Sequence, residues 1–232
     1  MKASVVIPAH NEEQNLAHTI RAVLAQDYHN FEVIVVNNAS NDATESIARS
    51  FPVTVVNENR KGLLWAREAG RVAATGDIII NIDADCLPEA NWLSRGMKHF
   101  KKDHVVAVTG PYDYHDGGFF FRNSSLYTQK YIYKLMSLAL QAPGIKKGAV
   151  LIGGNNFIRS NALNKAGGYT TSILFYGEDT DTAKKIAEHG TVVFNPSLHM
   201  KTSARRFKSE GTIHLMLKYW YHFFKTIFVS KK

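Results

Sequence analysis

Short apolar runs rich in β-branched residues alternate along the chain with segments whose apolar residues recur at helical spacing. The first kind predicts strands at residues 3–9, 31–37, 53–57, 76–83, 105–110 and 191–196. Between the first two strands, a helix is predicted by the spacing of Leu16, Ile20, Val23 and Leu24. Residues 40–51 and 177–190 open with polar or acidic side chains suited to a helix start. This alternation predicts an α/β fold with a mostly parallel central sheet flanked by helices.

The chain has 232 residues, which is enough for one large α/β domain and short for two. Cys86 is the only cysteine, which excludes an internal disulfide and a cysteine-cluster metal site, and we expect it to be packed in the core. The apolar run near the N-terminus is too short for a secretory leader. Together these features predict a cytoplasmic protein.

The formal net charge of +8 suits phosphate-bearing ligands, nucleic acid or an anionic membrane. The sequence has no zinc-finger spacing, no aromatic RNA-binding signature and no dense basic arm, so we expect no nucleic-acid partner. Motifs for a dinucleotide dehydrogenase, a P-loop enzyme and a serine hydrolase are also absent from the sequence.

Polar clusters follow three of the predicted strands. "PAHNEE" follows the first strand, "NNASND" the second, and "DADC" the run "IIINI". In open α/β sheets, ligands bind beyond the carboxyl ends of the strands, where the strand order reverses. The three clusters therefore predict one shared site at that edge of the sheet.

Asp83 and Asp85 crowd two like charges at the end of a buried strand. A bend there would turn both carboxylates to one side, where they would offer hard oxygen ligands to Mg²⁺ or Mn²⁺. Such ions take one or two protein carboxylates and complete their shell with ligand phosphates, which points to a diphosphate ligand. The alternative is an ordinary solvated loop.

Arginines are the other groups suited to hold a diphosphate, through bidentate contacts. Arg67 in "LLWAREAG" and the pair Arg205 and Arg206 in "TSARRF" are the best placed. The alternative for each is a cation on the surface or on the side of a helix.

The order of these motifs resembles glycosyltransferase family 2, whose members are nucleotide-sugar enzymes of the GT-A fold. The matching segments are "VVIPAHNEE", "VIVVNNASNDAT", "KGLLWAREAG", "ATGDIIINIDADCLP", "GGNNFIRSNALNKAGGY" and "YGEDTDTAKKIAEHG". They run from about residue 4 to residue 195 in family order. The resemblance implies a single GT-A, Rossmann-like domain, to which we assign residues 1–210. We assign residues 211–232, from their own pattern, to a basic, aromatic and amphipathic C-terminal helix.

The resemblance also implies a role for each matching residue. The loop that wraps the nucleotide base would consist of Pro8, Ala9, His10, Asn11 and Glu12. Arg67 would help to hold the nucleotide, Asp83 would lie near the ribose and the metal, and Asp85 would coordinate the metal. The acceptor side would be lined by Gly153, Gly154 and Asn155. The catalytic base would be Asp179, with Glu178 beside it on the acceptor side.

The chemistry of glycosyl transfer supports a base at Asp179. An inverting transfer needs one carboxylate to take the acceptor's proton while metal and cations stabilise the departing diphosphate. The acids of "GEDTD" also have a purely structural explanation, because carboxylates in the first turn of a helix stabilise it by interacting with the positive end of its macrodipole.

The sequence departs from the family pattern at Asn37 and Asn38, where the family commonly has Asp at the first or at both positions. An amide keeps an acceptor oxygen but adds a donor and loses the charge. The identity of the nucleotide base, and activity itself, therefore stay open. We predict UDP, ahead of GDP, as the nucleotide of the donor. His199 is a candidate third metal ligand, and its alternative is a packed or surface residue. The segment Q-x-x-R-W of processive synthases is absent, which favours transfer of a single sugar.

Residues 212–230 predict a helix that is apolar on all but about a quarter of its circumference, where the polar side chains are His214, Lys218, His222 and Lys225. Such a helix suits the plane of a membrane interface, and its alternative is packing in the core or in a dimer. The segment at 117–144 is also aromatic and basic. A lipid-linked acceptor and peripheral contact with the cytoplasmic membrane face would account for both segments.

We therefore expect a metal-dependent, inverting glycosyltransferase that moves one sugar from a nucleoside-diphosphate sugar to a hydroxyl acceptor, with Mn²⁺ or Mg²⁺ as cofactor. One alternative is a nucleotidyltransferase acting on a sugar phosphate. The other is a catalytically inactive, membrane-associated protein that binds sugar nucleotides, for which Asn37 and Asn38 are the only direct hint.

Overall fold

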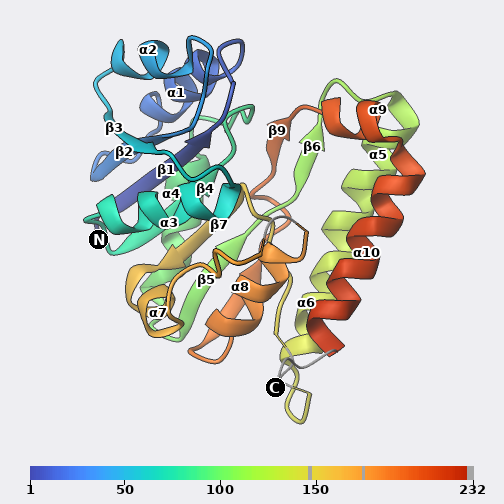
Figure 1. The fold of residues 1–232 in the computed structure, drawn as a ribbon. Coiled ribbons are helices and arrows are strands. Elements are labelled where there is room, and N and C mark those ends of the chain that lie inside the picture. Colours follow the sequence, from blue (N-terminus) through green and yellow to red (C-terminus); the bar gives the residue numbers. More distant parts are fainter. Residues whose placement is uncertain (146–147, 174–175, 229–232) are drawn as a thin grey trace.

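A seven-stranded sheet forms the centre of the protein, whose computed structural model describes residues 1–145, 148–173 and 176–228 (Figure 1). The strand order is β3-β2-β1-β4-β7-β5-β8. The strands span β1 Ala3–Ala9, β2 Phe31–Asn38, β3 Thr54–Glu58, β4 Ile78–Ile82, β5 Val105–Thr109, β7 Asn155–Arg159 and β8 Thr191–Phe194. All six strands predicted from β-branched runs are therefore confirmed, within two residues at each end.

Strand β7 is the strand of this sheet that the β-branched pattern missed. It lies between β4 and β5 and runs antiparallel to both, whereas the other neighbouring strands in the sheet are parallel. Strands β2 and β3 extend the sheet on one side of β1, and β4 lies on the other side. The order therefore reverses beside β1, and the carboxyl ends of β1, β2 and β4 meet at one edge.

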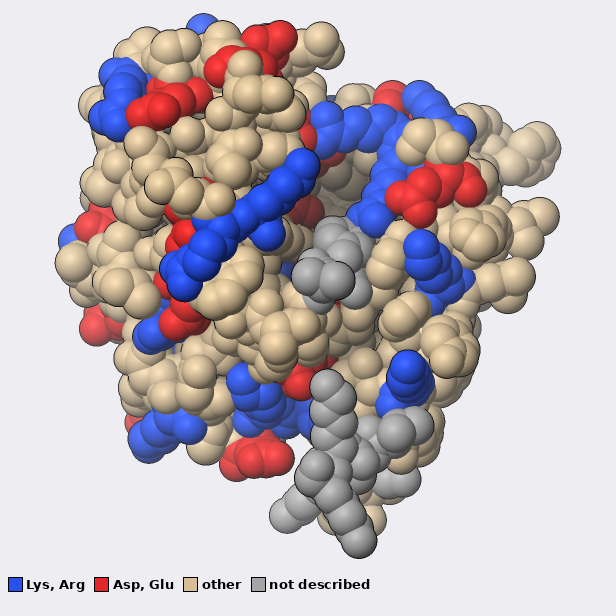
Figure 2. All heavy atoms as spheres, in the orientation of Figure 1, with Lys and Arg blue, Asp and Glu red and all other residues tan. Residues whose placement is uncertain are grey.

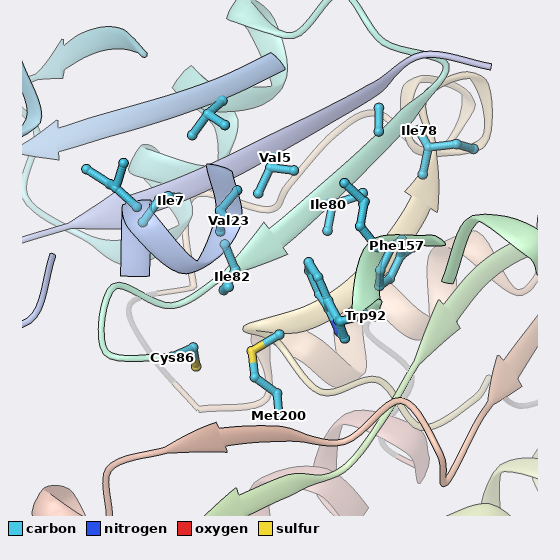
Figure 3. Packing of buried hydrophobic residues seen from close by; sticks show 14 of the residues in the cluster. Val5, Ile7, Val23, Ile78, Ile80, Ile82, Cys86, Trp92, Phe157 and Met200 are labelled. Carbon is cyan, nitrogen blue, oxygen red and sulfur yellow. The ribbon is translucent and has the colours of Figure 1, made fainter. Parts of the chain in front are cut away.

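Both faces of the sheet are covered by a hydrophobic core. Successive side chains of a strand point to opposite faces, so each strand contributes to both cores. Val5 and Ile7 pack with the first core cluster, whereas Val6 packs with the second. The first cluster includes Trp92 and Phe157, whose ring centroids are 4.7 Å apart (Figure 3). The buried Cys86 belongs to this cluster, as its packing prediction requires.

Six helices of the sheet layer flank these cores. They span α1 Leu16–Leu24, α2 Thr44–Arg49, α3 Leu63–Ala73, α4 Trp92–Met97, α7 Ser160–Lys165 and α8 Glu178–Ile186, and a short 3₁₀ turn, η1, spans Lys98–Lys101. The predicted helices at 16–24, within 40–51 and within 177–190 are thus present. The α/β fold with a mostly parallel sheet is confirmed.

A second layer of helices stands across from the carboxyl edge of the sheet (Figure 1). It contains α5 Phe119–Tyr127, the π-helical η2 Thr128–Tyr133, α6 Lys134–Gln141, α9 Arg205–Glu210 and α10 Thr212–Phe228. A two-stranded sheet of β6 Tyr112–Tyr114 and β9 Met200–Thr202 connects the layers. The predicted C-terminal helix is present over 212–228, and its last two predicted positions lie outside the described residues. The domain boundary at residue 210 stays a prediction.

The helical layer is held together by aromatic and aliphatic side chains. Tyr133 of η2 meets Trp220 of α10 at 5.9 Å between ring centroids. A small buried cluster joins Leu140 of α6 to Ile227 of α10. No helix in the described part of the chain is long and apolar enough to cross a membrane.

Gly96 lies where α4 crosses the buried ring of Phe157, and a Cβ at this position would clash with the ring. We expect Gly96→Ala to lower the free energy of unfolding by about 1–3 kcal/mol through overpacking, although alanine is the better helix former. Gly118→Ala is the control, because a Cβ there meets nothing within 4 Å. Urea unfolding followed by circular dichroism measures both, and equal midpoints for the two variants would contradict this account of the core.

Candidate functional site

A cavity of about 690 Å³ lies between the carboxyl edge of the sheet and the helical layer. Figure 2 shows it as a hollow bordered by lysine and arginine side chains. Its sheet side is polar and includes residues from each of the three predicted strand-end clusters. The site expected at this edge is therefore a real cleft.

A buried guanidinium connects two of the acids in the cleft. Arg67 of α3 is 3% exposed and contacts Asp179 Oδ1 through Nη1 at 3.0 Å and Asp83 Oδ1 through Nη2 at 3.6 Å. Burial alone would lower the pKa of Arg67, but the charges of Asp179 and Asp83 hold it above its ordinary value. Arg67 thus stays charged and faces carboxylates with both terminal nitrogens.

Two neighbouring acids begin helix α8 beside Arg67. Asp179 Oδ2 accepts a hydrogen bond of 3.0 Å from the backbone N–H of Gly153. Burial raises the pKa of Asp179 against the opposing charge of Arg67. Burial, and then the charge of Asp179, raise the pKa of Glu178 to about 7. The pair therefore offers a carboxylate that is more basic than one in water, as proton abstraction near neutral pH requires.

Gly153 and Gly154 let the backbone approach these acids closely. A Cβ on Gly153 would clash with Asp179, and one on Gly154 would clash with Asp83. Asp83 also accepts a 2.7 Å hydrogen bond from the hydroxyl of Tyr112. Burial raises the pKa of Tyr112 well above its ordinary value, so this hydroxyl stays protonated and donates.

Asp85 follows Asp83 by two residues and shares a cation with Glu12. The guanidinium of Arg205 donates to both carboxylate oxygens of Glu12, and its Nη2 is 3.4 Å from Asp85 Oδ2. Burial, and then the charge of Asp83, raise the pKa of Asp85 to about 6. Arg205 is half-exposed, so it offsets these charges without being locked in place.

The donor set at this point fits a hard divalent cation. Asp83 and Asp85 offer carboxylate oxygens and a local excess of negative charge. Within the described residues, no group of three or more His, Cys, Asp or Glu side chains is arranged to hold a metal. A pair of carboxylates is a donor set that suits Mg²⁺ or Mn²⁺ completed by phosphate oxygens and water.

Asn38 organises the loop that faces the first strand end. Its amide nitrogen donates to the carbonyls of Glu58 and Arg60 at 3.0 and 2.8 Å, and its oxygen accepts from the N–H of Gly62 at 2.8 Å. A carboxylate would face two carbonyl oxygens here and repel them. This accounts physically for an amide at position 38. His10 also bonds to the backbone carbonyl of Asn38 through Nδ1, at 2.7 Å.

Most of the residues expected in the site line the cleft. They are Pro8, Ala9, His10, Glu12, Asn38, Arg67, Asp83, Asp85, Gly153, Gly154, Glu178, Asp179, Arg205 and Arg206. Arg206 points its guanidinium to Glu210 and to the hydroxyl of Tyr176.

Four expected residues do not line the cleft. Asn11 is exposed and bonds to the loop after β2 through Ser40 and Asn41. The Asn37 amide donates to Asn57 and Glu45. Asn155 is fully buried and bonded to Trp92 and Leu198, so it supports the sheet rather than reaching an acceptor.

His199 is the fourth, and its Nε2 lies 3.1 Å from Glu89 Oε1. The structure thus gives no contact between His199 and Asp83 or Asp85.

The helical side of the cleft combines polar side chains with an apolar patch that was not anticipated residue by residue. The patch consists of Tyr133, Met136, Trp220 and Phe223, and Ile152 from the segment before β7 lies with it. The aromatic character of segments 117–144 and 212–228 signalled an apolar surface, but only the packing of η2 against α10 turns part of it toward the acids. The cleft therefore has a charged wall on the sheet side and an apolar patch on the helical side, which we call the apolar wall.

Comparisons with known proteins point in one direction. The family model described as glycosyl transferase family 2 matches residues 4–167. Glycosyltransferase AglE of Haloferax volcanii is 28% identical over 197 residues, which cover 81% of this chain and 62% of that relative. Uncharacterized glycosyltransferase YfnE of Bacillus subtilis is 35% identical over 117 residues, which cover 47% of this chain and 30% of that relative. The chain thus spans less than two thirds of these relatives.

Solved structures agree in fold. Mannosyltransferase PcManGT from Pyrobaculum calidifontis, in complex with GDP-Man and Mn²⁺, superposes with a TM-score of 0.76 at 26% identity and covers 100% of this chain and 65% of that one. Glucosyl-3-phosphoglycerate synthase from Mycobacterium tuberculosis, in complex with Mn²⁺, UDP and phosphoglyceric acid, has a TM-score of 0.65 at 20% identity, with 100% and 80% covered. These neighbours confirm the GT-A fold.

Arg205 and a divalent cation would compete for the charge of Asp85. We expect Arg205→Ala to raise the affinity for Mn²⁺ alone by about three- to tenfold, because a half-exposed ion pair contributes about 1 kcal/mol. Arg206→Ala is the control, since Arg206 pairs with Glu210 instead. The free Mn²⁺ signal in electron paramagnetic resonance measures binding. An unchanged or lower affinity in Arg205→Ala would show that this guanidinium does not oppose the metal.

Proposed function

The chain belongs to glycosyl transferase family 2, and from this premise we propose that it transfers a single sugar from a nucleoside-diphosphate sugar to a hydroxyl acceptor, with a divalent metal and with inversion at the sugar carbon. One observation carries the proposal: the base candidate Asp179 and the metal-side acid Asp83 each contact one terminal nitrogen of the Arg67 guanidinium. A base and a diphosphate site are thereby adjacent in one cleft.

The donor would lie along the polar wall. We assign the nucleoside to the side of His10 and Asn38 and the diphosphate to the side of Asp83, Asp85 and Arg205, all of which line the cleft. Mn²⁺ or Mg²⁺, when bound, supplies positive charge that stabilises the departing diphosphate. The structural neighbours include complexes with GDP-Man and with UDP, so the preference for UDP as the donor nucleotide stays a prediction from the sequence.

Asp179 would act as the general base. Its carboxylate takes the proton of the acceptor hydroxyl as that oxygen attacks the sugar carbon and the bond to the diphosphate breaks. Arg67 and the N–H of Gly153 each bond to one of its oxygens, so they fix the carboxylate toward the cleft. One base on the face opposite the leaving group gives inversion.

The acceptor would be lipid-linked. The apolar wall formed by Tyr133, Met136, Trp220 and Phe223 runs beside the segment that carries Gly153. A small polar acceptor would leave these side chains in contact with water, whereas a hydrocarbon chain would cover them and remove their apolar surface from water. Helix α10 contributes to this wall and would contact the membrane peripherally.

We expect Asp179→Asn to lower the rate of donor hydrolysis without acceptor by about 10²–10⁴-fold, because an amide cannot accept the proton from water. Asp181→Asn is the matched control, as Asp181 begins the same helix but bonds to Thr170. Release of nucleoside diphosphate measures the rate, and calorimetry with Mn²⁺ and UDP or GDP measures donor-site binding, which both variants should retain. Hydrolysis by Asp179→Asn at the rate of the unmodified protein would remove Asp179 from the reaction.

A further inference from the structure

Two exposed apolar stripes remain unexplained by the cleft. Helices α5, η2 and α6 follow one another without a break over residues 119–141, and we call them the rod. One side of the rod exposes large apolar side chains at spacings near three, four and seven residues, namely Phe120, Tyr127, Tyr131, Leu135 and Leu138. None of the five lines the cleft, which other sides of the rod border.

Helix α10 exposes a matching stripe. Its members, at spacings of three and four residues, are Ile213, Leu217, Tyr221, Phe224 and Phe228. The side of α10 that carries Trp220 and Phe223 faces the cleft instead. Each stripe therefore lies on a helix whose other faces are already packed or line the cleft.

The two helices lie side by side, so the stripes belong to one surface layer (Figure 1). Ring contact between Tyr133 and Trp220 and the cluster around Leu140 and Ile227 hold them together. Soluble proteins rarely expose apolar patches of this extent, and those that do generally bind another surface there.

The charges of this layer are of one sign. Neither the segment from Gly117 to Ile145 nor the segment from Gly211 to Phe228 contains an aspartate or a glutamate. Lys134 on the rod and Lys225 on α10 are exposed. Tyrosine and phenylalanine beside lysine are the side chains suited to the headgroup region of a bilayer.

We propose that the two stripes together form a docking face for the surface of an anionic lipid bilayer. Lysines would meet the headgroups, and the aromatic and aliphatic side chains would enter the boundary between headgroups and acyl chains. The rod thus becomes a second membrane element beside α10. The inference rests on the proposed function in one respect: docking brings a lipid-linked acceptor to the apolar wall, which the same two helices form.

A single cysteine label tests the face directly, because the native Cys86 is buried. Leu135→Cys and Leu217→Cys place an environment-sensitive fluorophore on the two stripes, and Val72→Cys on α3 is the matched control, with native exposures of 67%, 66% and 70%. The probes are vesicles of phosphatidylcholine with about 30% phosphatidylglycerol, and vesicles of phosphatidylcholine alone.

We expect both stripe labels to brighten and shift to the blue with anionic vesicles, while the label at position 72 stays unchanged. In flotation of the unlabelled protein, Lys134→Glu with Lys225→Glu should lower binding to anionic vesicles by about thirtyfold or more, since each of the two lysines near the surface contributes about 1 kcal/mol. Lys98→Glu with Lys101→Glu on η1 should leave it unchanged.

Three results would overturn the proposal: no response of either stripe label to anionic vesicles, equal responses at position 72, or a response that follows protein concentration without vesicles, which would identify an interface between two copies. Calorimetry with UDP or GDP and Mn²⁺ on the same preparations separates the two proposals. Loss of nucleotide binding with intact vesicle binding would reject the function alone, and the reverse would reject the docking face alone.

Discussion

The arrangement of the cleft depends on one buried cation. Arg67 comes from helix α3, Asp83 from the end of β4, and Asp179 from the start of α8, 112 residues further along the chain than Arg67. Asp179 and Asp83 carry like charges in a partly buried cleft, and burial first, then the charge of Asp83, raise the pKa of Asp179. A guanidinium is the side chain suited to this place, because its planar fork can bond two carboxylates at once and its charge cannot be titrated away.

A second arginine has a different physical position. Arg205 pairs with Glu12 and Asp85, but it is half-exposed, and it belongs to the short helix α9 rather than to the sheet layer. Its attraction to these acids is weakened by water, so a ligand can displace it at small cost. Arg67 therefore fixes the shape of the site, whereas Arg205 balances the negative charge of Glu12 and Asp85, which a bound metal would otherwise balance.

Strands buried on both faces were predictable because they read as β-branched runs, as at 78–82 in "IIINI". Strand β7 was not, because "NNFIR" opens with two asparagines whose amides bond inside the sheet and beside it. The strand-end rule located the polar wall around Asp83 and Asp85, and the family resemblance added Asp179. Neither could place His199 or Asn155, since the direction of a side chain after a strand depends on the backbone around it.

The apolar wall shows the same limit. An aromatic helix at 212–228 was evident from spacing, but its division into a cleft-facing side and an exposed side depends on how η2 and α6 pack against it. The amide of Asn38 is a further case. From the sequence it appeared to be a departure that put activity in doubt, whereas the carbonyls of Glu58 and Arg60 make it the residue that this loop requires.

The central claim is that Asp83, which Arg67 contacts, and the neighbouring Asp85 form a metal and diphosphate site. Anomalous diffraction at the manganese edge, from crystals grown with Mn²⁺ and UDP, tests it most directly. The account predicts a peak within about 2.0–2.5 Å of a carboxylate oxygen of Asp85, with the diphosphate completing the shell. A peak elsewhere in the molecule, or nucleotide bound in the cleft with no manganese beside Asp85, would contradict it.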